Sequence, residues 1–513
     1  MRRLLPFAAT LVLVILVAMV VLRQLLLQVE LREAAETRLS AMLGQPVSIG
    51  RLGVAIFPRL SVTGGDVRVG EVSTQAPALA IERIRLLPRL RPLLSGNVVI
   101  DEVQLDGFVV TVLHDEKGWH VPSAMPAPVA GDRGTVIERV RLADARVRIY
   151  DRVNNGEIVE RSSIDALHAE VTVDAGGLRL SPITGRIGGA AISGEARVDG
   201  KDARIELAAE VIDDEDLPVF LRLLGSERPA FLQLLEPGAL SADLRVDRAT
   251  SRLSGTGSLR APAVMLDPLR LQRFEAPLVI KGPRLEFAPA TFTLYDGRHT
   301  GTVGVDLGAT PPTWATDSRV SGIDAGAFLT ALTGRDQRFD GTGSITGVLR
   351  GRVGEPLVST VGGRARIEVT DGVIRHFPLL ASVNRALRLA EQAGSDTRFE
   401  RLSATLSIAS GASTTDDLVL EAAHVRVEAA GRIGADRSLA LRGVAVVSPE
   451  RSSAAIASIR ELSGLRNPSG EIEIPLTISG SLDAPSFGLD LQSAIKKGLA
   501  DELRRRLRRI IRD

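Results

Sequence analysis

Apolar and polar residues alternate in short runs along most of this chain. In residues 140–149, Val147 and Ile149 alternate with Arg146 and Arg148, and the same pattern returns in residues 170–174, 425–428 and 471–474. Side chains two positions apart lie on the same face of a strand, so the pattern predicts strands with one apolar and one polar face. Turn signals recur at short intervals from residue 47 to residue 490. This spacing predicts one extended β architecture rather than several compact domains.

A few helices are expected among the strands. Apolar residues recur at every fourth position from Leu27 to Leu39, and Gly44 and Pro46 end the helix that this period predicts over residues 25–42. Residues 216–224 and 324–332 share an initial aspartate and a glycine just beyond the end. These signals predict two short helices that belong to a weak internal repeat. Another helix is expected over residues 379–390, after Pro378.

The first long apolar run differs in kind from the strands. Residues 4–22 are apolar apart from Pro6 and Thr10. A helix of about 20 residues crosses the hydrocarbon core of a bilayer, so the run predicts a transmembrane anchor. A cleaved signal peptide is the alternative, but its apolar core is usually roughly 7–15 residues long and precedes a small-x-small site, which is absent after this run. The anchor would include Leu4, Leu11, Ile15, Val20 and Leu22.

The last residues combine an apolar period of four with a high density of basic side chains. Ile495, Leu499, Leu503, Leu507 and Ile511 are spaced in this way among lysines and arginines, which predicts a basic amphipathic helix. Three interpretations stay open: a solvated helix that caps the sheet, a helix on an anionic membrane surface, or a helix docked on a partner. Membrane or partner contact would use Leu499, Leu503, Arg505, Leu507 and Arg509.

These patterns divide the chain into segments. The first strands are expected over residues 47–56, 61–69, 79–86, 97–105 and 108–114. A stretch rich in proline, alanine and glycine then predicts a loop. The predicted segments are an anchor at 1–24, an N-terminal module at 25–121, a loop at 122–134, a middle β region with short helices at 135–355, a C-terminal region at 356–492 and the basic helix at 493–513.

Charge and cysteine content narrow the partners and the compartment. The chain has 63 Lys and Arg residues against 62 Asp and Glu residues. Domains that bind nucleic acid usually carry a marked basic excess, so nucleic acid is not expected as a partner. No cysteine occurs in 513 residues, which is compatible with an oxidising compartment. With Arg2 and Arg3 ahead of the apolar run, the charge bias favours a cytoplasmic N-terminus and a bulk outside the cytoplasm.

No combination of residues in the sequence predicts catalysis. The six histidines (His114, His120, His168, His299, His376 and His424) are scattered, and no His-Glu-x-x-His, Gly-x-Ser-x-Gly or Walker-type phosphate loop occurs. The acidic run at residues 213–216 could bind a cation, but acidic residues also favour a helix N-terminus, and a predicted helix starts there. We therefore expect no enzyme activity, no cofactor and no metal site.

A series of turn signals after the predicted anchor carries a resemblance. Residues 43–47 read Leu-Gly-Gln-Pro-Val, and Phe57-Pro58 and Gly65-Asp66-Val67 follow in order. This order resembles the start of the AsmA family of bacterial envelope proteins, in which a transmembrane helix leads into a helix, a strand, a Phe-Pro turn and an Asp-Val strand. Residues 92–107 and 114–119 fit the next features of the family. Residues 369–374, 399–408, 418–431 and 473–485 resemble its C-terminal region.

The resemblance implies a fold, a location and a function. The fold would be mainly β: a transmembrane helix, then an elongated, twisted antiparallel β-groove with a few short helices and a C-terminal amphipathic helix. The protein would be anchored in the inner membrane of a Gram-negative cell, with its bulk in the periplasm. It would transfer or hold phospholipid or another acyl-chain lipid in outer-membrane biogenesis. The candidate groove residues, with either alternating set able to face inward, are Val147, Ile149, Val171, Val173, Val425 and Val427.

A second hypothesis assigns the same strands to a structural role. The protein would then be an assembly scaffold with a closed, packed β core that holds outer-membrane or other envelope proteins. The two hypotheses differ in whether the apolar faces are filled by the protein itself, because an unfilled apolar face is a candidate binding surface.

Overall fold

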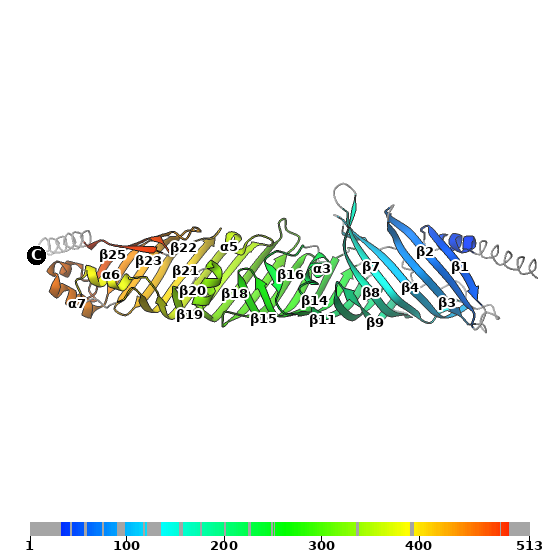
Figure 1. Ribbon diagram of the computed structural model, residues 1–513, viewed down its shortest axis with the longest axis horizontal. Coiled ribbons are helices and arrows are strands. Elements are labelled where there is room, and N and C mark those ends of the chain that lie inside the picture. The colour runs from blue at the N-terminus through cyan, green and yellow to red at the C-terminus, as the bar shows by residue number, and fades with distance from the viewer. Residues whose placement is uncertain are drawn as a thin grey trace, which may run out of the picture. The chain divides into compact units, whose positions relative to one another are not determined.

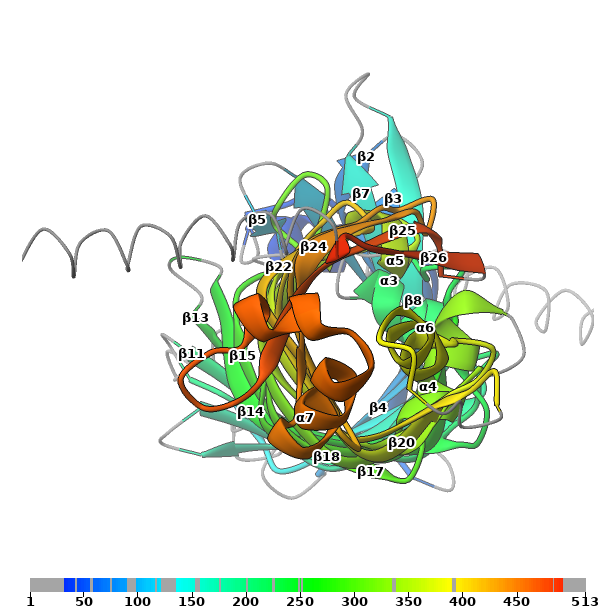
Figure 2. The same cartoon turned by 90° about the vertical axis from the view of Figure 1, so that its left-hand side faces the viewer.

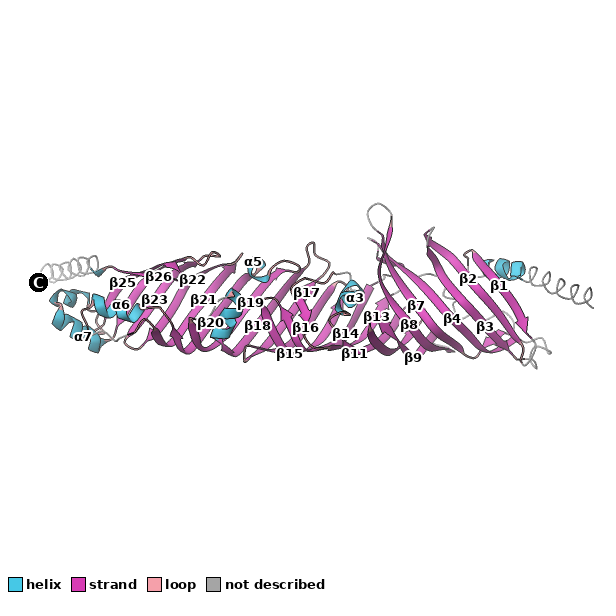
Figure 3. Cartoon of the chain, viewed as in Figure 1, coloured by secondary structure: helices cyan, strands magenta, loops and turns pink. Residues whose placement is uncertain are grey.

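The structure confirms a mainly β fold with a long, mostly antiparallel sheet. The computed structural model describes residues 32–41, 44–55, 59–73, 76–89, 98–115, 118–120, 135–152, 157–174, 177–199, 202–223, 227–247, 250, 252–334, 338–389, 394–482 and 484–491. These residues form strands β1 to β26 with a few short helices between them (Figure 3). The predicted anchor and the predicted C-terminal helix lie outside the described residues. Within the described part of the chain, no helix has the length and apolar character needed to cross a membrane.

The chain divides into two compact units. Unit 1 comprises Met1–Glu227 and Ala239–Gly257, and unit 2 comprises Arg228–Gly238 and Ser258–Asp513. Strand β14 (Arg252–Leu266) begins in unit 1 and ends in unit 2. The segment boundaries expected from the sequence stay predictions.

Unit 1 begins with antiparallel strand pairs, and two parallel pairs follow. The antiparallel strands are β1 (Val47–Ala55), β2 (Ser61–Ser73), β3 (Ala76–Pro88), β4 (Val98–Asp115) and the short β5 (Gly118–His120). The next two strands, β6 (Thr135–Ile137) and β7 (Val140–Arg152), run parallel to β4. The expected antiparallel arrangement therefore does not extend to the pairs that β4 forms with β6 and β7. A parallel pair needs a crossover of about a dozen residues or more, and residues 121–134 between β5 and β6 supply that length.

The rest of unit 1 is antiparallel again. The strands that follow β7 are β8 (Ile158–Asp174), β9 (Gly177–Ile187), β10 (Ala190–Val198), β11 (Asp202–Ile212) and β13 (Gly238–Asp247). A short helix, α3 (Leu217–Leu223), follows β11. It packs on β8, where the Ser162 hydroxyl donates a hydrogen bond of 3.4 Å to the carbonyl oxygen of Val219.

One long strand replaces two that the sequence predicts. Strands were expected over residues 97–105 and 108–114, but β4 runs without a break from Val98 to Asp115. Gly107 has a φ of +63°, in the left-handed region that glycine adopts without strain. A Cβ atom at this position would lie 2.7 Å from the Cγ atom of Glu82 on β3. Glycine here therefore allows a local irregularity and a close approach of β3, and the strand continues past it.

Unit 2 follows chain order closely (Figure 1). From β15 onward, each strand pairs antiparallel with the next one in the sequence. The strands are β12 (Leu232–Leu234), the end of β14, β15 (Leu269–Lys281), β16 (Arg284–Leu294), β17 (Gly297–Asp306), β18 (Thr313–Asp324), β19 (Phe339–Arg352), β20 (Gly362–Ile374), β21 (Thr397–Ala409), β22 (Ala412–Ala422), β23 (Val425–Ile433), β24 (Leu439–Val447), β25 (Ile472–Ser481) and β26 (Ala484–Leu489).

Short helices lie between these strands. They are α4 (Ala325–Thr333), α5 (Leu357–Thr360), α6 (Leu379–Ala386), α7 (Pro449–Ser458) and the 3₁₀ helix η1 (Arg460–Leu465). Helix α4 begins and ends as its sequence predicts: the Asp324 carboxylate accepts a hydrogen bond of 2.9 Å from the N–H of Ala327, and Gly334 ends the helix in the left-handed region. The helices expected over residues 216–224 and 379–390 are also present, as α3 and α6.

One end of unit 2 has a closed core. Helices α6 and α7 lie within the curve of the unit 2 strands (Figure 2). Leu379 and Val383 of α6 and Leu462 of η1 have no exposed surface, and they pack with residues of strands β20 to β25. We call this cluster the terminal core. Its close packing means that the protein itself fills the apolar face at this end.

Candidate functional site

A row of apolar side chains crosses unit 1 from strand to strand. Each member pairs directly with the next one on the neighbouring strand, and directly paired residues lie on the same face of a sheet. This unit 1 row consists of Val47, Val69, Leu79, Val110, Val147 and Ile164. It extends across β1, β2, β3, β4, β7 and β8.

The unit 1 row is covered at its start and more open further along. Val47, Val69 and Leu79 are buried in a cluster against which Ala35, from the helix over residues 32–41, also packs. Val147 and Ile164 are half-buried, and neither belongs to a packed cluster among the described residues. The row therefore begins in a packed core. It continues on an apolar face that the described residues cover only in part.

Unit 2 has a comparable row on strands β15 to β18. The unit 2 row consists of Ile280, Leu285, Val305 and Trp314. Leu285, Val305 and Trp314 are half-buried and lie outside the packed clusters of the described chain. The ring of Trp314 lies against the backbone of Gly351 on β19, where a Cβ atom would come within 2.6 Å of it. A second row runs alongside, with Leu278, Phe287 and Val303 paired in the same way.

The opposite ends of these strands are covered by α4. Val320 and Ile323 are buried in a cluster that Phe328 of α4 completes, and the rings of Tyr295 and Phe328 lie 6.2 Å apart. His299 belongs to this covered end, since its ring stacks on Phe292 at 3.8 Å. Strands β15 to β18 thus have one packed end under α4 and one half-open end that carries the unit 2 row.

His299 is a structural residue of the covered end. Its Nδ1 atom lies 3.2 Å from the carbonyl oxygen of Ala290, and its Nε2 atom lies 2.9 Å from the hydroxyl of Ser318. Burial lowers the pKa of His299 below its ordinary value. A neutral imidazole satisfies both contacts, donating from Nδ1 and accepting at Nε2.

The other face of the sheet is polar. Pairs of opposite charge lie across neighbouring strands, such as Arg284 with Asp306 at 2.8 Å and Arg401 with Glu421 at 2.9 Å. Exposed pairs of this kind contribute little to stability. They show instead that this face of the sheet is exposed to solvent. The one-sided character expected from the alternating pattern is present in both units.

The six residues predicted for the groove differ in burial and in the residues that surround them. Val147 lies in the unit 1 row, Ile149 is buried beside it and pairs with Val112 and Ser162, and Val171 is half-buried opposite Leu180. Val173 is part of β8, and its side chain lies outside what the structure describes. Val425 and Val427 are buried in the terminal core. The structure therefore does not bring the six into one site.

The unit 2 row was missed at the level of sequence, although a signal for it exists. The apolar residues Leu285 and Phe287 flank Glu286, and Val303 and Val305 flank Gly304. The alternation used for residues 140–149 applies equally to these segments. Trp314 has no such local signal, because its place in the row depends on the pairing of β17 with β18.

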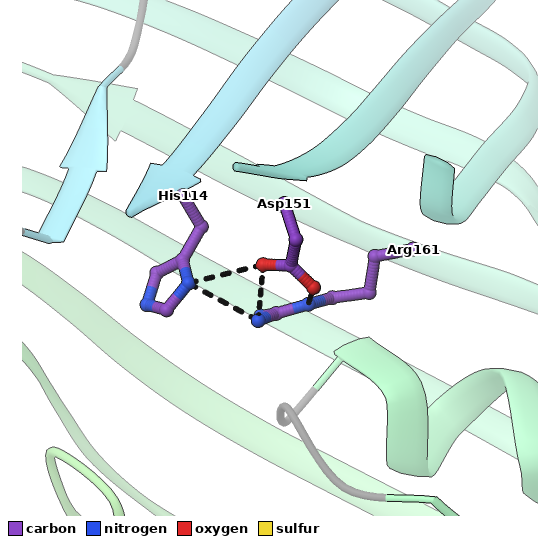
Figure 4. A network of polar contacts seen from close by, with 3 residues as sticks. All are labelled: His114, Asp151 and Arg161. Carbon is purple, nitrogen blue, oxygen red and sulfur yellow. Dashed lines mark hydrogen bonds and ion pairs between the residues drawn. The ribbon is translucent and has the colours of Figure 1, made fainter. Parts of the chain in front are cut away.

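The apolar face of unit 1 is followed by a polar cluster of His114, Asp151 and Arg161, from β4, β7 and β8 (Figure 4). Asp151 follows Ile149 by two residues and pairs with His114 in the sheet. The Nε atom of Arg161 donates a hydrogen bond of 2.6 Å to Asp151, and Nδ1 of His114 lies 3.1 Å from both the Asp151 carboxylate and Nη2 of Arg161. The Arg161 side chain is only 11% exposed, so the cluster is held in place rather than loosely solvated.

A pocket of about 350 Å³ lies beside this cluster, between α3 and the strands that it covers. Its lining is mostly polar and consists of Glu160, Arg161, Ser162, Ser163, Asp165, Gly188, Val219 and Arg222. The described residues contain no group of histidine and carboxylate side chains placed to hold a metal ion. Asp216 of the acidic run is buried, and its carboxylate accepts hydrogen bonds from the backbone N–H groups of Gly189 at 2.6 Å and Asp213 at 3.2 Å.

The model of the AsmA family matches residues 257–418. The chain contains an AsmA family domain. This AsmA domain includes the unit 2 row and helix α4, and it confirms the resemblance over these residues. The N-terminal motif at residues 43–58 lies outside the match. No curated protein matches this chain.

Proposed function

We propose that this protein is a non-enzymatic, membrane-anchored envelope protein that holds or transfers phospholipid, or another acyl-chain lipid, on its half-open apolar faces. The observation that carries the proposal is the unit 2 row: Leu285, Val305 and Trp314 lie side by side inside an AsmA domain and outside any packed cluster of described residues. An apolar surface that the protein does not fill calls for an apolar occupant.

The mechanism would be physical rather than chemical. Each CH₂ group that leaves water gains about 0.8 kcal/mol. Neighbouring strands are about 4.8 Å apart, so the rows offer apolar side chains at short, regular intervals. An acyl chain is several strand spacings long and would contact several side chains at once. It could therefore move along a row with little change in buried area, while its headgroup stays at a polar edge.

The location proposed for this activity is the inner membrane, with the bulk of the chain in the periplasm and a role in outer-membrane biogenesis. It rests on the apolar run over residues 4–22, on Arg2 and Arg3 before it, and on the absence of cysteine. The AsmA domain supports an envelope role. The basic C-terminal segment, with Leu499, Leu503, Arg505, Leu507 and Arg509, would contact a membrane or a partner.

A scaffold for outer-membrane or other envelope proteins is the second candidate, and the terminal core favours it. There, Val425, Val427 and residues of α6 and α7 belong to one closely packed cluster of described residues. A protein built in this way throughout would present only its polar surface to partners.

Crosslinking in cells separates the two candidates. A photoreactive amino acid would replace Val171 or Val305, which lie on the apolar faces, or the exposed Thr172 or Thr302 on the same strands. We expect lipid adducts, identified by mass spectrometry, at the two valine positions and none at the two threonine positions. Adducts with proteins alone at all four positions would support the scaffold. The absence of lipid from both valine positions would reject lipid holding.

A further inference from the structure

The polar pocket under α3 adjoins the apolar face of unit 1. Ser162 lines the pocket and pairs directly with Ile149, which is next to Val147 of the unit 1 row on the same face of β7. Val147, Ile149 and Asp151 are successive side chains on this face of β7, so the face changes from apolar to charged over four residues. An apolar row that ends at a polar pocket matches the shape of an amphiphile, with its tail on the row and its polar end in the pocket.

Half of the charged side chains that line the pocket have strong partners. Arg161 is bound to Asp151. Asp165 accepts a hydrogen bond of 2.6 Å from the Ser163 hydroxyl and pairs with Arg146 at 2.6 Å. These contacts neutralise one cationic and one anionic group of the lining, so neither group needs a ligand.

The other two charged residues are not matched in this way. The Nε atom of Arg222 is buried and has no hydrogen-bond partner among the described residues. Glu160 accepts one long hydrogen bond, of 3.4 Å, from the Tyr150 hydroxyl, and the described part of the chain pairs no cation with it. Buried polar groups in proteins are usually hydrogen-bonded, so a buried guanidinium nitrogen without a partner in a pocket wall suggests a partner that is not part of the protein.

We infer that this pocket binds the headgroup of a zwitterionic phospholipid, one with a phosphate diester and an ammonium group. Arg222 would bind the phosphate, because a guanidinium group recognises phosphate oxygens with two parallel hydrogen bonds. Glu160 would bind the ammonium group. The hydroxyl of Ser162 donates its proton to the carbonyl oxygen of Val219 over 3.4 Å, so its oxygen would accept a hydrogen bond from the ammonium group. The inference rests on the proposed function, because it names the lipid class that the apolar face would hold.

The same chemistry could come from a soluble molecule, so the test includes both sources. The full-length protein in mild detergent is mixed in turn with dihexanoyl-phosphatidylethanolamine, dihexanoyl-phosphatidylglycerol, phosphoethanolamine or inorganic phosphate. Native mass spectrometry then measures the bound fraction. We expect the phosphatidylethanolamine to bind best, because it has an acyl part for the row and both charges for the pocket.

Two substitutions separate the roles of the charged residues. Arg222→Gln should weaken binding of both lipids about tenfold or more, since both contain a phosphate and lose a charge-assisted contact. Glu160→Gln should weaken only the phosphatidylethanolamine, so the preference over phosphatidylglycerol disappears. The matched controls are Arg179→Gln and Glu206→Gln, which change exposed side chains of β9 and β11 and should leave binding unchanged. If Arg222→Gln does not fold, as judged by its thermal unfolding, the lipid preference of Glu160→Gln decides the test.

The outcomes distinguish this inference from the proposed function. Equal binding of both lipids by the wild type and both variants would overturn the headgroup site, while lipid adducts at Val171 would keep lipid holding. Phosphoethanolamine binding that depends on both residues, without any lipid binding, would assign the pocket to a soluble ligand and reject the proposed function. Inorganic phosphate bound as tightly as phosphoethanolamine would overturn the role of Glu160.

Discussion

The carboxylate of Glu36 accepts a hydrogen bond of 2.7 Å from the backbone N–H of Ile49. Ser40, on the same helix over residues 32–41, accepts a hydrogen bond of 2.9 Å from the N–H of Val47. Both N–H groups belong to β1, the first strand of unit 1, and they would otherwise be open for pairing with another strand. Side chains of the first described helix therefore cap the edge of the sheet at the point where the unit 1 row begins.

This edge cap predicts a local change in hydrogen exchange. Glu36→Ala removes the acceptor for Ile49, and a hydrogen bond to a charged group contributes about 1.5–3 kcal/mol. The backbone N–H of Ile49 should then exchange about tenfold faster or more, as measured by hydrogen–deuterium exchange. The control is Glu33→Ala on the same helix, whose side chain is exposed. Unchanged exchange at Ile49 in Glu36→Ala would contradict the cap.

The contact between Trp314 and Gly351 predicts a fluorescence change. Gly351→Val would place a side chain within 2.6 Å of the indole ring and force the ring away from the sheet. In a Trp119→Phe background, which leaves Trp314 as the only tryptophan of the chain, its emission should shift to the red as the ring enters water. Gly304→Ala is the matched control, because its Cβ atom would meet only the Ala315 carbonyl oxygen, at 3.9 Å. Identical spectra for the two variants would show that the ring does not depend on Gly351.

The buried imidazole of His299 predicts a pH dependence of stability. Burial lowers the pKa of His299 in the folded state, so the unfolded chain binds a proton more readily than the folded one. This part of the stability is present above the ordinary histidine pKa of about 6.5 and is lost as the pH falls towards the folded pKa. The wild-type unfolding temperature should therefore drop between about pH 7.5 and about pH 5 by more than that of His299→Gln.

Aspartates with lowered pKa values also make stability depend on pH, but they act below the range of about pH 5 to about pH 7.5 that tests His299. Hydrogen bonds from Thr405 lower the pKa of Asp417, and hydrogen bonds from Ser438 lower that of Asp436. The stability that such carboxylates contribute is lost only as the pH falls below about 3.9, their ordinary pKa. A His299→Gln variant whose unfolding temperature changes with pH as much as that of the wild type would refute the assignment.

The terminal core predicts a large effect of truncation. Leu462→Ala removes a side chain with no exposed surface, and buried leucine-to-alanine changes cost about 2–5 kcal/mol. Leu329→Ala, on helix α4, changes a leucine that is 37% exposed and should cost much less. Chemical denaturation of the full chain, followed by the loss of strand signal in circular dichroism, measures both. Equal destabilisation by the two variants would show that the terminal core is not a tightly packed unit.

Local patterns predicted much of the fold. The alternation around Val147 identifies the two faces of β7 without any knowledge of its neighbours, because successive side chains of a strand point to opposite sides. The ends of α4 are equally local, since Asp324 and Gly334 act on the backbone groups of the helix itself. In both cases the atoms that decide the outcome are a few residues apart in the chain.

Other features depend on residues that are far apart in the sequence. Two strands were expected over residues 97–105 and 108–114, but β4 continues through Gly107 because β3 and β7 pair with the residues on both sides. Val147 and Val427 have similar local patterns, yet one is half-buried in a row and the other is packed in the terminal core. In the terminal core, residues of α6, α7 and η1 pack together with the apolar faces of several strands.

The sequence by itself determined the one-sided strands, with their apolar and polar faces, and the helices α3, α4 and α6, because each of these follows from side chains that are close together in the chain. The tertiary structure decided where those faces are filled, which rows continue from strand to strand, and that Glu160 and Arg222 line one pocket. These outcomes depend on strand register and on the packing of helices over particular strands, and both join residues that local periodicity cannot relate.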